Sequence, residues 1–325
     1  MEASIVLTYR CNCKCYMCNI WKYPTSVEEE FEPQVLNKLP NLGFCNITGG
    51  EPFLRDDIEE IIKILKRKSK RIVISTNGYL TERIIEVAKK NKDIGIRISI
   101  EGLPEANDKL RGIKDGFDHG LRTLLNLKKM GLKDIGFGIT VSDRNARDMM
   151  ELYELAKFLD VEFATAVVHN GYYFHSYNNE IKSKKEVISY FKKLINELLN
   201  TKKPKNWFRA YFNYGIINYI NENKRLLPCE AGSENFFLDP FGEIRPCNGM
   251  EEKYWIDSMG NLKTSSFEEI WFSEKATQIR EKVKNCPKTC WMIGTASPVM
   301  KKYIKYPLKW ILSAKFFRKS ETLCP

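Results

Sequence analysis

The stretch Cys11-Asn-Cys-Lys-Cys15-Tyr-Met-Cys18 governs the interpretation of the chain, because it places cysteines four and then three residues apart in one short loop. The loop follows the apolar run Ser4–Thr8. Iron–sulfur clusters are held by cysteine thiolates that lie close together, so Cys11, Cys15 and Cys18 are candidate ligands of such a cluster. A four-iron cluster with three cysteine ligands keeps one iron open, as a catalytic metal site does.

Two other cysteines near the N-terminus are expected to bind no iron. Cys13 lies inside the loop but off this spacing, and Cys45 lies in an apolar run that we predict to be a strand. A free cysteine often behaves as a small buried hydrophobic residue.

Short β-branched runs alternate with amphipathic segments from the N-terminus to about residue 168, which is typical of a parallel sheet covered by helices. The predicted strands are Ser4–Thr8, Phe44–Thr48, Arg71–Thr76, Gly95–Ile100, Ile135–Val141 and Val161–Val167. The predicted helices are Pro33–Leu39, Asp57–Lys66, Thr81–Lys89, Phe117–Met130 and Ala146–Leu159. Six such units favour an α/β fold with a partial (β/α)6, TIM-like barrel over a closed eight-stranded barrel.

Polar or glycine-rich motifs follow four of the predicted strands, each at the point where the strand ends. The cysteine loop follows the first strand, and Gly49-Gly50-Glu51-Pro52, Ser75–Gly78 and Ser99–Gly102 follow the next three. Ligands bind at the carboxyl ends of parallel strands, so we expect these four segments to surround one site.

With these motifs in view, residues 1–168 resemble the radical S-adenosylmethionine (SAM) enzymes, through the three-cysteine spacing and the GGEP motif. The resemblance implies a [4Fe–4S] cluster on Cys11, Cys15 and Cys18, with the amino and carboxylate groups of SAM at the open iron. It also implies that SAM is cleaved reductively to a 5′-deoxyadenosyl radical, which abstracts a hydrogen atom from the substrate.

The resemblance further assigns cofactor-binding residues. Gly49 and Gly50 would let the backbone approach the methionine part of SAM, and the carboxylate of Glu51 suits its ammonium group. Other contacts with SAM are expected from Tyr16, Met17, Ser75, Asn77, Ser99, Glu101 and Arg111, with Gly136–Val141 as the strand beside the adenine. Tyr16 and Met17 are alternatives for packing against the adenine, and Ser75 and Ser99 are equally good candidates for helix caps. The family usually has aspartate where this chain has Glu101.

A second group of cysteines, Cys229, Cys247, Cys286 and Cys290, lies within residues 228–295, where a hairpin is predicted around Asp239-Pro-Phe-Gly242. Four thiolates can close a cluster completely. The group resembles the short C-terminal extension of radical SAM enzymes called twitch, which is related to the longer SPASM domain, and this implies one auxiliary cluster, which we take to be [4Fe–4S]. Structural zinc is the competing interpretation.

We divide the chain by these features into a barrel (1–180), bridging helices (181–227, with Lys184–Leu199 and Trp207–Asn223), a small cysteine-rich auxiliary-cluster domain (228–295) and a basic amphipathic tail (296–325).

In the loop after the sixth strand, His169, Tyr172 and His175 are candidate catalytic or substrate-binding residues. A packed aromatic loop is an equally good interpretation of the same residues.

The net charge of +11 is concentrated in the tail, where residues 296–325 carry seven basic residues and one acidic residue, so no specific nucleic-acid partner is expected. Residues 299–319 interleave basic and large apolar residues, which suggests peripheral contact with an anionic membrane. Pro307 and the position of Lys315 on the helix argue against this, and a helix docked on the barrel is the alternative. The chain shows no secretion leader and no apolar run of about 20 residues, so we expect a cytoplasmic protein, at most peripheral at the inner face of the membrane.

From these features we expect a radical SAM oxidoreductase that oxidises or crosslinks an unactivated C–H position of a peptide or small polar metabolite. The auxiliary cluster would accept an electron, and flavodoxin or ferredoxin would be the reductant. One alternative is a membrane-associated radical SAM enzyme acting on a lipid or lipid-linked saccharide. An alternative of another class, a non-catalytic iron–sulfur or zinc-binding module, would make the strand-end motifs coincidental.

Overall fold

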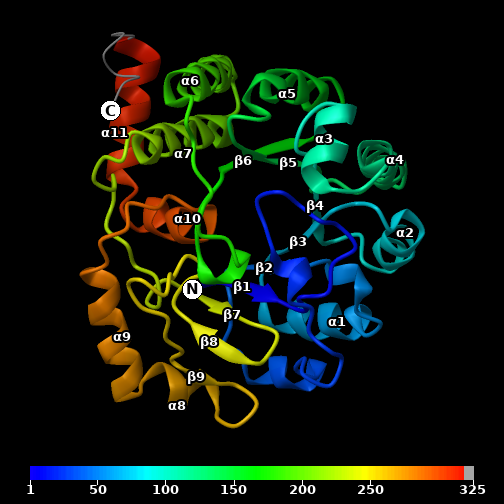
Figure 1. Cartoon of the computed structure of the whole chain (residues 1–325), viewed down its shortest axis with the longest axis vertical. Coiled ribbons are helices and arrows are strands. Elements are labelled where there is room, and N and C mark those ends of the chain that lie inside the picture. Colours follow the sequence, from blue (N-terminus) through cyan, green and yellow to red (C-terminus); the bar gives the residue numbers. More distant parts are fainter. Residues whose placement is uncertain (318–325) are drawn as a thin grey trace.

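The computed structural model describes residues 1–317, and the part of the predicted tail beyond them, 318–325, lies outside the described residues. Within residues 1–317 one sheet of nine strands runs in the order β6-β5-β4-β3-β2-β1-β7-β8-β9, with helices along its outer side (Figure 1).

The first six strands are parallel and lie side by side in the order of the sequence. They are β1 (Glu2–Val6), β2 (Phe44–Thr48), β3 (Ile72–Thr76), β4 (Gly95–Ser99), β5 (Ile135–Val141) and β6 (Glu162–Val167). Their apolar side chains, such as Ile47, Ile74 and Ile96, are fully buried against the covering helices. The predicted partial barrel is therefore confirmed.

Most of the helices that follow these strands are amphipathic, which explains why they cover the sheet. The helices are α1 (Ile58–Lys68), α2 (Thr81–Lys90), α3 (Pro104–Arg111), α4 (Gly116–Lys129), α5 (Met149–Phe158), α6 (Lys184–Asn200) and α7 (Pro204–Ile220). Two are exceptions, because α3 is largely polar and α7 is buried on most of its sides. The segment predicted as a helix at Pro33–Leu39 is a 3-10 helix, Pro33–Lys38. Helix α3 was missed because its sequence, PEANDKLR, is largely polar and lacks an apolar stripe.

The predicted hairpin around Asp239 is present, and it continues the barrel sheet. Strand β7 (Asn235–Leu238) lies parallel to β1 and antiparallel to β8 (Glu243–Arg245), which pairs with β9 (Gly260–Asn261). The Asp239 carboxylate shapes the turn by accepting hydrogen bonds from the Phe241 and Glu243 amides, each at 3.0 Å. Because β7 pairs with β1, the first strand does not lie at an open edge of the sheet.

The remaining helices are α8 (Phe267–Trp271), α9 (Glu274–Lys284), α10 (Ile293–Lys302) and α11 (Lys305–Leu312). Figure 1 shows α8 and α9 beside the hairpin, α10 near β1, and α11 against α7. No helix within residues 1–317 combines the length and the apolar composition needed to cross a membrane.

Trp291 joins the C-terminal part of the chain to the bridging helices. The indole is almost fully buried, and its Nε1–H donates to the Phe212 carbonyl of α7 at 3.0 Å. Gly215, one turn further along α7, leaves room for this ring, because a Cβ at that position would overlap the indole.

We predict that Gly215→Ala destabilises the protein although alanine is the better helix former by about 1 kcal/mol. The added methyl group forces the Trp291 ring to move, and overpacking of this kind costs about 1–3 kcal/mol. Urea unfolding would measure the change. Gly138→Ala is the matched control, because nothing lies within 4 Å of a Cβ placed there. Equal stability of the two variants would contradict the prediction.

Candidate active site

The cysteine loop is fixed by the end of α3. The amides of Lys14 and Tyr16 donate to the carbonyls of Arg111 and Leu110, at 2.9 and 2.8 Å. Gly112 ends the helix with a φ of +58°, and a Cβ there would lie 2.6 Å from the Lys14 carbonyl. The helix that the sequence pattern missed is therefore the one that holds the loop.

The glycine pair of the GGEP motif is needed where two stretches of backbone touch. The Gly50 amide donates to the Thr8 carbonyl at 2.7 Å, and the Glu51 amide donates to the Arg10 carbonyl at 2.8 Å. A Cβ on Gly50 would overlap the Arg10 carbonyl, and one on Gly49 would lie 2.8 Å from that of Thr8. Packing against the segment before Cys11 thus explains these glycines, in addition to the ligand approach expected from sequence.

Glu51 is fully buried and connects the GGEP turn to the end of β3. Its Oε1 accepts hydrogen bonds from the Phe53 amide at 3.1 Å and from Oγ1 of Thr76 at 2.8 Å, and its Oε2 accepts from the Asn77 amide at 2.8 Å. Burial raises the pKa of Glu51, while these hydrogen bonds oppose the shift. A carboxylate oxygen can accept two hydrogen bonds, so Oε2 keeps capacity for an ammonium donor.

Arg111 and Glu101 form a buried ion pair beside the cysteine loop. Nη1 of Arg111 donates to Oε1 of Glu101 at 3.1 Å, and Oε2 of Glu101 accepts from the Thr140 amide at 2.6 Å. The Arg111 Nε is buried without a hydrogen-bond partner in residues 1–317. Burial acts to lower the pKa of Arg111, but the nearby Cys15, Cys13, Glu101 and Cys11 together raise that pKa above its ordinary value.

This unpartnered Nε–H tests whether the site fits the expected cofactors. A buried donor without an acceptor is costly unless a ligand supplies one. A guanidinium N–H beside three cysteines suits an anionic partner, and both a thiolate-bound cluster and the carboxylate of SAM are anionic. The residues present therefore fit a [4Fe–4S] cluster with SAM.

The other predicted cofactor residues lie around the same strand ends. Asn77 donates from Nδ2 to Oδ1 of Asn12 in the cysteine loop at 2.6 Å. Ser75 donates to Oδ1 of Asn46 at 3.0 Å, and Ser99 ends β4. Neither serine caps a helix, because α2 and α3 begin after Leu80 and Leu103, so the capping alternative is wrong for both.

Tyr16 and Met17 differ in how far they are buried. Met17 belongs to the buried core, whereas Tyr16 is 47% exposed and carries the Arg144 guanidinium 3.5 Å from its ring centre.

Of the two glycines in β5, Gly138 faces open space, but a Cβ on Gly136 would overlap the Glu162 carbonyl. Gly138 is thus the position that leaves room for a flat base, and Gly136 is required by strand packing.

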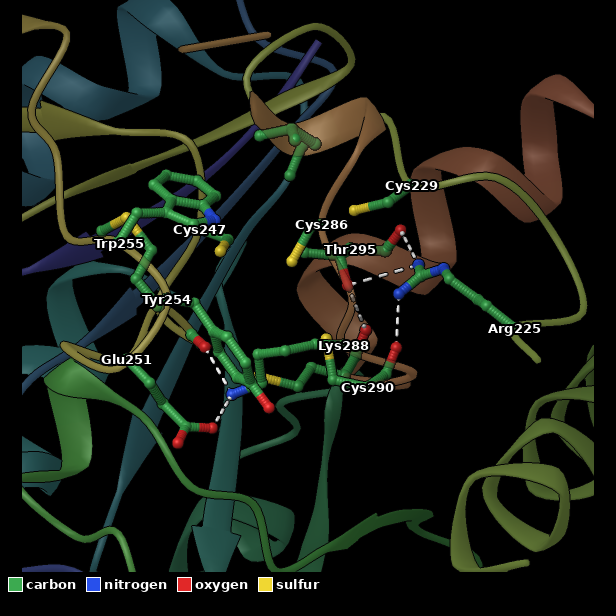
Figure 2. Close-up of a pocket in the computed structure, with 15 residues that line it drawn as sticks. Arg225, Cys229, Cys247, Glu251, Tyr254, Trp255, Cys286, Lys288, Cys290 and Thr295 are labelled. Atoms are coloured by element: carbon green, nitrogen blue, oxygen red, sulfur yellow. Dashed lines mark hydrogen bonds and ion pairs between the residues drawn. The ribbon is translucent and has the colours of Figure 1, made fainter. Parts of the chain in front are cut away.

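The four C-terminal cysteines line one pocket, and Figure 2 shows Cys229, Cys247, Cys286 and Cys290 around a common space. Burial and the neighbouring thiols raise the pKa of Cys247, and burial is the main cause that raises the pKa of Cys290 to about 11. Within residues 1–317 no group of three or more His, Cys, Asp or Glu side chains is arranged to hold a single metal ion. Four cysteines around one pocket are the ligand set that holds an iron–sulfur cluster.

Two half-buried cations line this pocket, and sequence reasoning missed both. Lys288, between Cys286 and Cys290, pairs with Glu251 and donates to the Gly249 carbonyl at 2.7 Å (Figure 2). Arg225 donates to the carbonyls of Cys290 and Thr295, and its guanidinium lies 5.1 Å from the Trp291 ring centre. No local pattern marks these two residues, because their partners are distant in sequence.

The loop after β6, residues 169–179, is attached to the auxiliary pocket; we call it the linking loop. Lys288 donates to the Asn170 carbonyl at 3.0 Å, and the Tyr172 amide donates to the Met250 carbonyl. The Trp291 amide donates to Nε2 of His169 at 3.3 Å.

The same loop is attached to the cysteine loop and to the GGEP turn. The Asn19 amide donates to the Phe174 carbonyl at 2.8 Å, and Nδ2 of Asn179 donates to the Met17 carbonyl at 3.0 Å. The Tyr173 hydroxyl donates to the Gly49 carbonyl at 2.8 Å. The linking loop therefore contacts both cysteine sites.

The structure favours the packed alternative for His169. Its Nδ1 lies 2.6 Å from the Val167 carbonyl, Nε2 accepts from the Trp291 amide, and the ring stacks on Tyr219 at 4.4 Å. Burial lowers the pKa of His169 to about 4, so the ring stays neutral near pH 7. With both nitrogens used inside the protein, His169 has no atom left for a substrate, which corrects its candidate catalytic role.

His175 keeps its candidate role. It adopts a φ of +45°, which is strained for a residue with a side chain, and its buried Nε2 has no partner in residues 1–317. The ring stacks on Tyr23 at 4.4 Å and lies 5.9 Å from the Tyr172 ring. Tyr172 is half-buried under the Arg245 guanidinium, at 4.8 Å.

The two cysteine groups lie in two parts of the chain that match models of known protein families. The radical SAM superfamily model matches residues 5–156, and the iron-sulfur cluster-binding domain called SPASM matches residues 229–292. Fe-coproporphyrin III synthase of Methanosarcina barkeri is 37% identical over 162 residues, 46% of this chain and 39% of that protein. Protein AlbA of Bacillus subtilis, named for antilisterial bacteriocin subtilosin biosynthesis, is 27% identical over 268 residues, 75% of this chain and 54% of AlbA. The chain spans about half of these relatives or less.

Solved structures share the fold. SuiB of Streptococcus suis superposes with a TM-score of 0.63 at 16% identity, covering 86% of this chain and 67% of SuiB. The AdoMet-bound enzyme anSMEcpe gives 0.62 at 18% identity, covering 98% of this chain and 97% of that one. The second match includes the C-terminal domain as well as the barrel.

We predict that the wild-type protein, reconstituted without oxygen, holds about eight iron and eight sulfide ions per chain, since each cubane holds four of each. Replacing Cys11, Cys15 and Cys18 together by alanine should leave about four of each, and so should replacing Cys229, Cys247, Cys286 and Cys290. Cys45→Ala, which removes a buried thiol outside both sites, is the control and should keep the wild-type content. Zinc in place of the C-terminal iron would refute the auxiliary cluster.

Lys288→Met should destabilise the protein by about 3–5 kcal/mol, because it leaves the buried Glu251 carboxylate without a partner whose side chain is only 13% exposed. Lys253 also pairs with Glu251, at 3.5 Å, but its side chain is 63% exposed, so Lys253→Met should cost less than about 1 kcal/mol. Urea unfolding and iron content would be measured for both. An equal loss of stability in the two variants would contradict the prediction, because burial of the Lys288–Glu251 pair would then make no difference to stability.

Proposed function

The chain belongs to the radical SAM superfamily and carries a C-terminal SPASM iron–sulfur domain, and from this premise we propose that it oxidises an unactivated C–H position of a peptide. A [4Fe–4S] cluster with SAM supplies, when bound, the 5′-deoxyadenosyl radical that abstracts a hydrogen atom. One observation carries the proposal: the cysteine loop, the GGEP turn and the Glu101–Arg111 pair meet at one edge of the sheet and are linked to a second four-cysteine pocket.

The chain's own residues have distinct tasks in this proposal. Cys11, Cys15 and Cys18 hold the cluster, the Nε–H of Arg111 binds an anionic group beside it, and Oε2 of Glu51 accepts from the ammonium group of SAM. The exposed ring of Tyr16 and the open space at Gly138 are available to the adenine.

Oxidation is favoured over simple hydrogen transfer because the C-terminal pocket would hold a one-electron acceptor. Removal of a hydrogen atom from C–H leaves a carbon radical, and loss of one electron and one proton from that radical completes a two-electron oxidation. The ammonium of Lys288 and the guanidinium of Arg225 line this pocket and favour a bound anionic cluster. Flavodoxin or ferredoxin is the proposed source of the first electron.

A peptide is the substrate class that the relatives support over the larger part of the chain. Solved structures with the same fold include SuiB bound to the precursor peptide SuiA and anSMEcpe bound to a Cp18Cys peptide. AlbA, matched over 75% of this chain, is named for bacteriocin biosynthesis, whereas the Fe-coproporphyrin III synthase match covers 46%. A lipid or lipid-linked saccharide is the second candidate, favoured by the exposed basic and apolar side chains of α11.

We expect reduced wild-type protein to convert SAM into methionine and 5′-deoxyadenosine, and Cys15→Ala to form neither, because the cluster loses a ligand. Glu51→Gln should weaken SAM binding by about 10- to 150-fold, since the loss of one charged hydrogen bond costs about 1.5–3 kcal/mol. Chromatography of deoxyadenosine and equilibrium dialysis of SAM would measure these effects, with Cys45→Ala as the unchanged control.

Absence of deoxyadenosine from the reduced, iron-loaded wild type would reject SAM cleavage. The peptide class is tested separately by mass spectrometry of a mixture of short peptides that contains all amino acids. Deoxyadenosine formation should rise with the mixture, and one peptide should lose the mass of two hydrogen atoms. Deoxyadenosine formation without any change in peptide mass would reject the peptide and leave SAM cleavage intact.

A further inference from the structure

The outward side of α11 is apolar although the helix is already docked on the protein. Its inner side is packed: Pro307 and Ile311 are buried, and the Trp310 ring lies 4.9 Å from the Tyr214 ring of α7. Figure 1 shows α11 against α7 at the margin of the molecule. On the outward side Leu308 and Leu312 remain 43% and 53% exposed. The helix is therefore docked on the protein, which was one prediction from the sequence. Its outward side is nevertheless apolar and exposed, as the other prediction, contact with a membrane, requires.

Ile304, at 42% exposure, precedes these leucines at the same four-residue spacing, so the three side chains form one stripe. Lys305 and Lys309 are exposed and follow the stripe one position along the helix. We call Ile304, Lys305, Leu308, Lys309 and Leu312 the α11 face, and a shallow hollow is lined by its last four residues and Ser313.

The charge of the α11 face is not neutralised by the protein. Lys301 and Lys302, one turn earlier, are paired with carboxylates, Lys301 with Glu2 and Lys302 with Glu234. Neither Lys305 nor Lys309 has a carboxylate partner among residues 1–317, and the sequence from 299 to 317 contains no acidic residue. The surface thus combines an apolar stripe with uncompensated positive charge.

The structure removes both sequence arguments against a membrane role. Pro307 is the third residue of α11, and the first turn of a helix tolerates proline because its amides have no partner within the helix. Lys315 does not interrupt the outward stripe. Its Nζ donates to the carbonyls of Leu199 and Thr201, and it lies 4.5 Å from the Trp207 ring centre, so it faces the protein and satisfies the end of α6.

We propose that the α11 face docks on an anionic lipid surface, with the apolar stripe among the acyl chains and the two lysines at the phosphate groups. An in-plane amphipathic helix binds by this combination of apolar burial and attraction to anionic headgroups. The sequence that follows, outside the described residues, contains Arg318, Lys319 and Glu321. The proposal concerns the location of the protein and does not depend on its reaction.

The test uses the full-length, iron-loaded protein and flotation with vesicles. One vesicle is an equal mixture of phosphatidylglycerol and phosphatidylcholine, and the other is phosphatidylcholine alone. We expect binding to the mixed vesicle, weak binding to the neutral one, and a loss at high salt. Leu308→Ser with Lys309→Glu should lower the bound fraction about tenfold, since it removes one apolar anchor and reverses one charge that is attracted to the anionic headgroups.

The matched control is Phe272→Ser with Lys275→Glu, which also removes an exposed apolar side chain and reverses an exposed lysine, but lies where α8 ends and α9 begins. It should bind vesicles as the wild type does. Equal flotation of the two double variants, or no flotation of the wild type, would overturn the proposal. So would light scattering that shows a wild-type dimer lost in Leu308→Ser, because a second copy would then cover the α11 face.

Discussion

The close contact between two stretches of backbone, residues 8–10 and 49–51, is the constraint on which the rest of the site depends. The Gly50 and Glu51 amides donate to the Thr8 and Arg10 carbonyls, and the approach leaves no room for a Cβ on Gly50. The contact fixes the position of residues 8–10, which lead directly into the cysteine loop. It also places the Glu51 carboxylate beneath the ends of β2 and β3, where three donors hold it. A ligand that meets these groups therefore meets a site whose geometry is set before it binds.

The linking loop extends this constraint to the second cysteine group. Tyr173 and Asn179 attach it to the GGEP turn and the cysteine loop, while Lys288 and Trp291 attach it to the auxiliary pocket. The pairing of β7 with β1 supports the same connection, because the hairpin of the C-terminal domain continues the barrel sheet. The two pockets thus belong to one continuous structure. A substrate held near His175 would lie on the loop that contacts both.

Positive charge beside the cysteines, shielded wholly or partly from water, is the other common feature of the two sites. Arg111 stands beside the first cysteine group, and Lys288 and Arg225 stand beside the second. Burying a cation is costly unless an anion compensates it, and each carboxylate partner, Glu101 or Glu251, offsets part of that cost. The unpartnered Nε–H of Arg111 indicates that a further anion belongs in the first site. The pattern suits cofactors that bring negative charge.

Periodicity, spacing and turn residues are local signals, so the six parallel strands, the helices with apolar stripes, the two cysteine groups and the turn at Asp239 could be predicted from the sequence. The folded structure was needed to show that α3 holds the cysteine loop, that His169 is packed, that Lys288 lines the second pocket and that Lys315 faces the protein. Each of these depends on contacts between residues far apart in the chain, such as the 122 positions between His169 and Trp291. A pattern confined to neighbouring residues carries no information about such a partner, so it can identify a polar side chain without showing what that side chain binds.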